Sequence, residues 1–135
     1  TIKHVLIRPS VKICYPWKLT VGDYSWIGDE VVLYTLGNIK IGSHTVVSQR
    51  CYICTGSHDY TLPTFNIYAK DIQIGDGVWI ASDVFVSPGI TVGDGAVVGV
   101  RSTVLHDLPA GMICYGYPAQ PVKPRRMNTN ANLSS

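Results

Sequence analysis

Residues 72–104 read "IQIGDGVWIASDVFVSPGITVGDGAVVGVRSTV" and carry an aliphatic residue at every sixth position. These positions are Ile74, Ile80, Val86, Val92, Val98 and Val104. A period of six fits neither an α-helix nor a simple alternating strand, but it fits a short strand followed by a tight turn. Three such units form one coil of about 18 residues, with an aliphatic side chain filling each inner corner. We therefore expect a solenoid of stacked parallel strands.

The same spacing, with a few longer steps, continues toward the N-terminus at Ile7, Ile13, Val21, Ile27, Leu33, Ile41, Val47 and Ile53. All fourteen positions are Val, Ile or Leu, and eleven of them are followed by Gly, Ala, Ser or Cys. A small residue there lets the backbone turn and lets the coils stack closely. With strands about 4.8 Å apart, about five to six coils give an all-β prism about 25 Å tall. We label its faces a, b and c in chain order, starting with Ile7 on face a.

The longer steps all fall at one corner of this prism. Two steps of eight residues and one of 21 residues each lead from face b to face c. The longest contains "CTGSHDYTLPTF", residues 54–65. We expect residues 1–108 to form a parallel β-helix with an inserted loop at about residues 57–71. We expect the Pro- and Gly-rich residues 109–126 to wrap back along the outside, and residues 127–135 to form a disordered tail.

Composition excludes several classes of protein. The formal net charge is +2 and only 15% of the residues are charged, which does not give the concentrated basic stripe of a nucleic-acid-binding protein. No apolar run approaches the roughly 18 residues of a membrane helix, so we expect no membrane span.

The cysteines allow two interpretations. Cys51 and Cys54 form a C-x2-C pair, which is typical of a metal or redox site, or of small buried residues in a reducing cytosol. Cys14 and Cys54 occupy the small-residue position, and Cys51 points toward the core from two positions before Ile53. We favour the second interpretation and expect no metal site.

Three segments carry a resemblance to a known family: "IGSHTVVSQRCYICTGSH", residues 41–58; residues 72–111; and "CYGYPAQPVK", residues 114–123. They resemble the hexapeptide-repeat acyltransferases with a left-handed parallel β-helix. Within that family, residues 8–34 and "CTGSHDY", residues 54–60, are most similar to the acetyltransferases of colanic-acid-type exopolysaccharide biosynthesis. The resemblance implies acetyl-CoA as co-substrate, a sugar or polysaccharide precursor as acceptor, and a cytoplasmic homotrimer with active sites at subunit interfaces.

The resemblance places the family's general base on His58. Acetyl transfer to a sugar hydroxyl requires removal of a proton as the oxygen attacks the thioester, and histidine is the side chain best suited to this near neutral pH. Attack is expected to be direct, without an acyl-enzyme. The backbone amide of Ser82 is our candidate for holding the oxyanion.

Further residues carry over by alignment. Those expected at the coenzyme are Ala81, Ser82, Gly99, Val100, Arg101, His106 and Lys123, with Arg125 helping at the phosphates. Those expected at the acceptor are Tyr34, Asp59, Tyr60 and Trp79. Asp59 is equally suited to orient the imidazole or to cap a turn. Packing alone explains the presence of Trp79 equally well. Tyr34, Tyr60, Phe65 and Tyr68 fit a trimer interface as well as a surface on which a sugar ring stacks.

Two alternatives remain. A non-catalytic solenoid predicts neither a histidine in a long insertion nor coenzyme-like coils. A carbonic-anhydrase-like enzyme on the same fold needs three histidines around zinc, two of them about five residues apart. His58 has no such partner, because the positions five before and five after it are Ile53 and Pro63. The sequence also departs from the family's pattern: Gly28 stands where relatives acting on simple sugars have Asn, and Leu105-His106 replaces a basic pair. These departures leave the acceptor undetermined.

Overall fold

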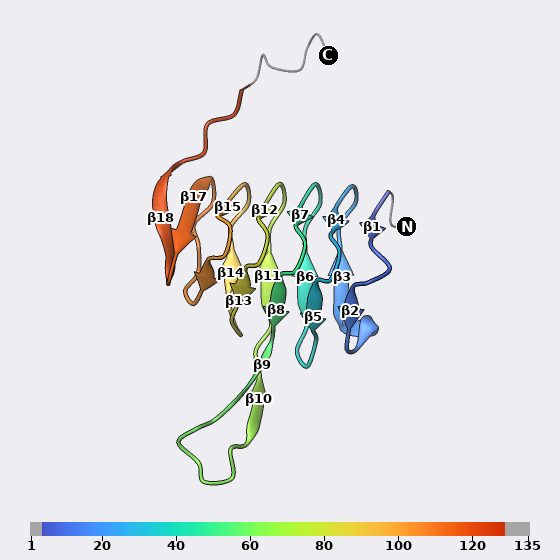
Figure 1. Ribbon diagram of the computed structural model, residues 1–135, viewed down its shortest axis with the longest axis vertical. Coiled ribbons are helices and arrows are strands. Elements are labelled where there is room, and N and C mark those ends of the chain that lie inside the picture. Colours follow the sequence, from blue (N-terminus) through green and yellow to red (C-terminus); the bar gives the residue numbers. More distant parts are fainter. Residues whose placement is uncertain (1–3, 129–135) are drawn as a thin grey trace.

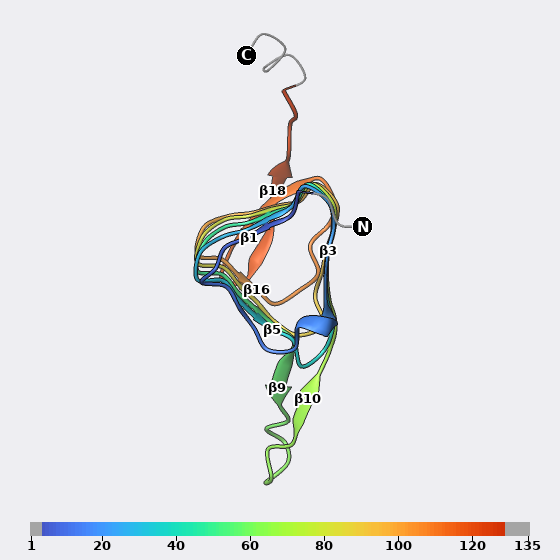
Figure 2. The ribbon, with the colours of Figure 1, turned by 90° about the vertical axis from the view of Figure 1, so that its right-hand side faces the viewer.

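The computed structural model describes residues 4–128, which form a triangular prism of stacked strands (Figures 1 and 2). Face a holds β1 (Leu6–Ile7), β4 (Trp26–Ile27), β7 (Val46–Val47), β12 (Trp79–Ile80), β15 (Val97–Val98), β17 (Met112–Gly116) and β18 (Ala119–Pro124). Face b holds β2 (Lys12–Ile13), β5 (Val32–Tyr34), β8 (Tyr52–Cys54), β13 (Phe85–Val86) and β16 (Thr103–Val104). Face c holds β3 (Leu19–Val21), β6 (Ile39–Ile41), β11 (Ile72–Ile74) and β14 (Thr91–Val92).

The register confirms the predicted repeat. On face a, for example, Ile27 pairs with Val47, Val47 with Ile80 and Ile80 with Val98, all in parallel. Every predicted core position from Val21 to Val104 is buried. Ile7 and Ile13 are more exposed because the first coil has a neighbour on one side only.

Gly-Asp steps link successive coils. The Asp76 carboxylate accepts a hydrogen bond from the Ser43 amide at 2.8 Å, and the Asp94 carboxylate accepts one from the Asp76 amide at 2.8 Å. A Cβ on Gly75 would collide with the Asp94 carboxylate, so glycine is required there. The Gly-Asp pairs are therefore stacking elements as well as turns.

All three insertions lie at the corner between faces b and c, as predicted. The first contains the 3-10 turn η1 (Pro16–Lys18) and the last contains β9 (Gly56–His58) and β10 (Ile67–Ala69). These two strands form an antiparallel hairpin that projects from the prism (Figure 2). The insertion expected as a loop at about residues 57–71 thus begins and ends in two short paired strands, with the loop of residues 59–66 between them.

The C-terminal segment forms the last strands of the prism. β17 joins face a as the next parallel strand after β15, and β18 pairs antiparallel beyond it. Arg125, directly after β18, reaches back to the carbonyl oxygens of Gly95 and Gly77 in the preceding coils. Cys114 and Ala119 are buried, so this segment closes the end of the core. Of the expected tail at residues 127–135, residues 129–135 lie outside the described part of the chain.

Three of the four cysteines are buried. Cys51, Cys54 and Cys114 lie inside, whereas Cys14 in the outermost coil is exposed, which differs from the expectation of a buried residue. Burial raises the pKa of the Cys51 thiol to about 11, and its Sγ donates to the Ala81 carbonyl oxygen at 3.0 Å. Within residues 4–128, no group of three or more metal-ligating side chains gathers, and no helix has the length and hydrophobicity needed to cross a membrane.

Candidate active site

A buried threonine anchors the projecting hairpin. The Thr55 hydroxyl donates to the Tyr34 carbonyl oxygen at 2.6 Å and accepts from the Gly37 amide at 2.8 Å. The Thr55 carbonyl oxygen accepts from the Lys70 amide at 2.9 Å, which closes the base of the hairpin. Because Thr55 is fully buried, these bonds tie the hairpin to the preceding coil.

The first residue of β9 packs against that same coil. A Cβ on Gly56 would lie 2.5 Å from Leu36 Cδ1 and 2.9 Å from Tyr34 Cε2. A glycine lets β9 approach these two side chains without displacing them. Tyr34, Leu36, Gly56, Ser57, His58 and Ile67 line a recess of about 70 Å³ there.

His58 ends β9 opposite Ile67 of β10. Its Nδ1 lies 2.8 Å from the Phe65 carbonyl oxygen. A carbonyl oxygen only accepts hydrogen bonds, so Nδ1 carries the proton and Nε2 keeps a free lone pair. The side chain is exposed, and its recess has room for a hydroxyl group or a few waters but not for a sugar ring.

Asp59 does not orient this imidazole. Its carboxylate accepts hydrogen bonds from the amide and the hydroxyl of Thr61, which lower the pKa of Asp59. The turn-capping alternative therefore describes its conformation here. Tyr60 follows with 84% of its surface exposed, while Tyr34 lies beside the histidine recess.

Five of the expected coenzyme residues meet at the corner between faces a and b. Ala81, Ser82, Gly99, Val100 and Arg101 lie there on successive coils, with the Arg101 amide donating to the Ser82 carbonyl oxygen at 2.9 Å. Among the described residues, the amides of Ser82 and Val100 have no hydrogen-bond partner. Val100 is 62% exposed, so these amides are accessible to a ligand laid along the corner.

Trp79 and Lys123 share one row of face a. Trp79 pairs with Val97, Val97 with Ile113 and Ile113 with Lys123, so all four take the same position in neighbouring strands. The Trp79 indole nitrogen donates to the Ser48 hydroxyl at 3.0 Å while 48% of the side chain stays exposed. Toward the N-terminal end of the prism the same row continues through Val46, Trp26 and Leu6. Arg125 takes another place, where its guanidinium donates to the carbonyl oxygens of Gly77 and Gly95.

The two parts of the predicted site lie at different corners of the protomer. His58 stands on the hairpin at the corner between faces b and c, while Ser82 and Val100 lie at the corner between faces a and b (Figure 2). His106 follows β16 and belongs to the corner of His58, not to that of Ser82. Within one protomer, the predicted base and the predicted coenzyme residues are therefore separated.

The fold matches solved acetyltransferases. A hexapeptide-repeat acetyltransferase from Vibrio cholerae superposes with a TM-score of 0.87 at 27% identity, covering 94% of this chain and 74% of that one. Over 123 residues the chain is 59% identical to a protein of Escherichia coli strain K12 that carries the name colanic acid biosynthesis acetyltransferase WcaF, which covers 91% of this chain and 68% of that protein. The chain belongs to the hexapeptide-repeat acetyltransferases.

Other hexapeptide-repeat acetyltransferases extend the comparison. The Vibrio cholerae enzyme has also been solved in complex with acetyl coenzyme A, and that structure superposes with a TM-score of 0.87 at 26% identity, covering 93% of this chain and 71% of that one. The galactoside O-acetyltransferase of Escherichia coli is 31% identical over 104 residues, 76% of this chain and 46% of that protein. A scan against models of known protein families gives no match.

Sequence reasoning missed several residues of the hairpin site. Thr55, Leu36 and the Phe65 carbonyl act through contacts between coils or across the hairpin, and no local pattern reveals them. Gly56 is the first residue of β9, and the reason for a glycine there, close packing on Leu36 and Tyr34, requires the structure.

Proposed function

We propose that this chain transfers the acetyl group of acetyl-CoA to a hydroxyl of a sugar or exopolysaccharide precursor, with His58 as general base. The observation that carries the proposal is the hydrogen bond between the His58 imidazole and the Phe65 carbonyl oxygen. The Phe65 carbonyl holds its Nδ1–H and leaves the Nε2 lone pair directed away from the hairpin bond, beside a recess that admits a hydroxyl group.

The proposed reaction proceeds by direct attack of the acceptor hydroxyl on the thioester. Nε2 takes the proton of the acceptor hydroxyl as its oxygen forms a bond to the thioester carbonyl carbon. The carbonyl oxygen becomes an oxyanion, for which the Ser82 amide is the candidate donor. The C–S bond then breaks, and the thiolate recovers the proton from Nε2. The histidine ends neutral, and no acyl-enzyme forms.

The accessible amides of Ser82 and Val100 support binding of the co-substrate at the corner between faces a and b. An extended pantetheine chain has amide groups that pair with such backbone groups much as a neighbouring strand does. Trp79 lies beside this corner, and Arg101 lies at it. Lys123 lies further along the row of face a, where a cation could pair with the phosphates of the coenzyme. His106 lies at the same corner as His58, so in an oligomer it would approach the coenzyme of a neighbouring copy.

The separation of the base from the coenzyme residues within one protomer supports a homotrimer in which His58 of one copy faces the Ser82 corner of the next. Both neighbouring faces carry exposed apolar side chains suited to packing between copies, with Leu6 and Trp79 on face a and Tyr52 and Phe85 on face b. The four cysteines, all free thiols, fit the cytoplasm, where acetyl-CoA is made.

The test mixes the purified chain with acetyl-CoA and a panel of mono- and oligosaccharides and follows the free thiol of CoA with a thiol-reactive dye. A Cys14→Ser variant is used because the exposed Cys14 would itself react with the dye. We expect thiol release that depends on the acceptor. Absence of thiol release with every hydroxyl acceptor, together with absence of acetyl-CoA binding, would refute the proposal.

A further inference from the structure

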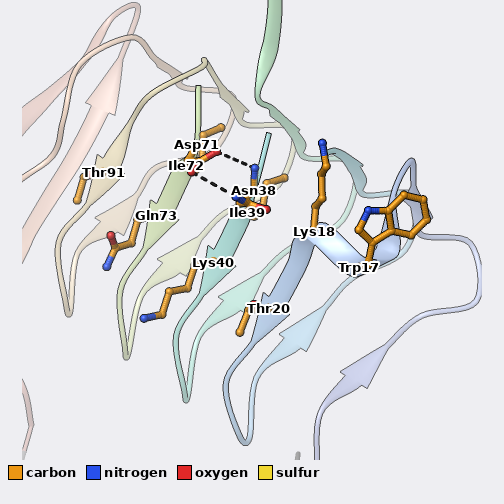
Figure 3. Close-up of a pocket in the computed structure, with 10 residues that line it drawn as sticks. All are labelled: Trp17, Lys18, Thr20, Asn38, Ile39, Lys40, Asp71, Ile72, Gln73 and Thr91. Atoms are coloured by element: carbon orange, nitrogen blue, oxygen red, sulfur yellow. Dashed lines mark hydrogen bonds between the residues drawn. The ribbon is translucent and has the colours of Figure 1, made fainter. Parts of the chain in front are cut away.

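Face c carries a polar groove that the proposed reaction does not use. The groove has a volume of about 350 Å³ (Figure 3) and is lined at its centre by Thr20, Lys40, Gln73 and Thr91. These four residues come from β3, β6, β11 and β14, and the register places them side by side in one row. Four strands at a spacing of about 4.8 Å give a row about 14 Å long, which exceeds one sugar ring.

One end of the groove is bounded by an exposed indole. Trp17 belongs to η1, and 77% of its surface is exposed. Such exposure is unusual for a tryptophan. The ring meets Tyr15 at a centroid distance of 5.3 Å, which restricts its motion. A flat apolar ring with a polar edge, held beside hydrogen-bonding side chains, suits the C–H face of a sugar.

The charges in the groove favour an anion. Lys18 and Lys40 contribute two cations against the single carboxylate of Asp71. That carboxylate accepts hydrogen bonds from the amide and the side chain of Asn38, at 2.8 Å and 3.4 Å (Figure 3). The ammonium of Lys18 donates to the Leu36 carbonyl oxygen at 2.6 Å. Within residues 4–128 the Lys40 ammonium has neither a hydrogen bond nor an ion pair, and it stands between Thr20 and Gln73.

We propose that this groove binds an acidic oligosaccharide, a run of sugar residues with at least one uronic-acid carboxylate, at a site separate from His58. The choice of carbohydrate rests on the proposed function, in which the acceptor is a sugar or its polymer. Hydroxyl, amide and carboxylate side chains match sugar hydroxyls, which both donate and accept, and Lys40 matches the carboxylate. Two lysines without an arginine do not form a nucleic-acid surface, and the polar lining lacks the apolar centre of a protein interface.

The groove begins where the hairpin returns to the prism, so a bound chain has a route toward the histidine. Asp71 lines the groove and directly follows Lys70. Lys70 in turn lines a second hollow of about 390 Å³ along β10, together with Asp59, Asn66, Ile67, Tyr68 and Ala69. The groove on face c therefore binds sugar units of the acceptor polymer that are not acetylated. The sugar unit that reacts lies at the hairpin.

The test uses indole N–H signals in the NMR spectrum of the full chain without acetyl-CoA. The probe is a hyaluronan hexasaccharide, in which glucuronate alternates with a neutral sugar, and maltohexaose is the neutral probe of equal length. We expect the acidic probe to move the Trp17 signal and the Lys40 amide signal while Trp79, whose indole is bonded to Ser48, stays in place. Raising the salt from 50 to 500 mM should weaken the effect.

Two variants sharpen the result. Lys40→Gln should weaken binding of the acidic probe about fivefold, the scale of one exposed ion pair, whereas the control Lys12→Gln on face b should not change it. Trp17→Ala should abolish the movement of the Lys40 amide signal. Because Trp17 is exposed, unchanged Trp26 and Trp79 signals will confirm folding. No movement of the Trp17 and Lys40 signals, or equal binding of maltohexaose that is indifferent to Lys40→Gln, would overturn the proposal.

The outcome stays distinct from that of the proposed reaction. A His58→Ala variant should bind the hexasaccharide as the unmodified chain does. Trp17→Ala should leave thiol release with a monosaccharide acceptor unchanged and raise KM for acidic oligosaccharide acceptors. Hexasaccharide binding without thiol release to any acceptor would refute the proposed reaction and uphold the groove, whereas thiol release without movement of the Trp17 and Lys40 signals would refute the groove alone.

Discussion

The Nδ1 atom of His58 lies 2.8 Å from the carbonyl oxygen of Phe65. Both residues belong to the hairpin insertion, and a bond from the Asp59 amide to the Asn66 carbonyl oxygen, also at 2.8 Å, closes the loop between them. A backbone carbonyl cannot change its charge and cannot donate. It therefore fixes the tautomer of the imidazole without help from a carboxylate, and the hairpin carries its own orienting group.

Replacing the proposed base tests the role of this arrangement. His58→Ala should lower kcat by about 10²–10⁴-fold, the usual contribution of a general base, with little change in acetyl-CoA binding. His44→Asn is the matched control, because His44 sits in a distant turn with a φ of 55°, which Asn tolerates. Steady-state thiol release measures both. A rate within a few-fold of the unmodified chain for His58→Ala would remove the base assignment.

The contact of Gly56 with the preceding coil should control the histidine's position. Gly56→Ala places a Cβ 2.5 Å from Leu36 Cδ1 and 2.9 Å from Tyr34 Cε2, so either these side chains or the hairpin must shift. We expect the hairpin to move and kcat to fall about tenfold. The double variant Gly56→Ala/Leu36→Ala removes that collision and should recover part of the activity. Equal activity of Gly56→Ala and the unmodified chain would contradict this role of the glycine.

Two buried threonines at the same corner allow a matched comparison. Thr55 bonds to Tyr34 and Gly37, and Thr35, one coil earlier, bonds to both backbone groups of Tyr15. Each Thr→Val change leaves buried polar groups unpaired and should lower the free energy of unfolding by about 1–3 kcal/mol. Urea unfolding measures this.

Only Thr55→Val should also lower kcat, since Thr55 alone anchors the hairpin. An equal loss of activity in Thr35→Val would mean that general stability, not hairpin position, is responsible.

Sharing of the active site between copies predicts complementation. His58→Ala and Val100→Trp should each be inactive alone, the first for lack of the base and the second because a large side chain fills the coenzyme corner. Val100 is 62% exposed, so the fold should tolerate tryptophan. Refolding the two together should restore roughly a quarter of the activity, because some sites then combine two intact halves. No recovery in a mixed oligomer would place both halves within one copy.

The buried thiol of Cys51 predicts a dependence of stability on alkaline pH. Burial raises its pKa from 9.0 to about 11, so the unfolded chain releases the proton at lower pH than the folded chain. The stabilising contribution is complete below about pH 9 and is lost as the pH rises toward 11. Between pH 8 and 10.5, urea midpoints should therefore fall more for the unmodified chain than for Cys51→Ala. Parallel curves for the two proteins would contradict the assignment.

Much of the prism was predictable because its pattern is local and repeated. The six-residue spacing and the small residue after most core positions predicted the coils and the faces. The three longer steps predicted the corner at which the hairpin leaves the prism. The course of residues 109–126 was not predictable in the same way. Pro and Gly suggested an outer wrap, and in the structure the buried Cys114 and Ala119 belong to the final strands of face a.

The site divides along a similar line. Alignment placed His58, Ser82 and Val100, and the structure brings the last two together on neighbouring coils. The Asp59 carboxylate bonds to Thr61, two residues away, and the partner of His58 is a backbone carbonyl. Backbone carbonyls carry no residue identity, so no sequence motif reveals which one receives the bond.

The sequence by itself determined the repeat and the faces, because a six-residue period constrains every coil in the same way. Its resemblance to an acetyltransferase family came from particular segments between residues 41 and 123. Only the tertiary structure decided how the hairpin stands on Thr55 and Gly56, which tautomer His58 adopts, and that the base and the coenzyme corner lie apart in one protomer. These features depend on contacts between residues far apart along the chain, and their geometry exists only once the coils have stacked.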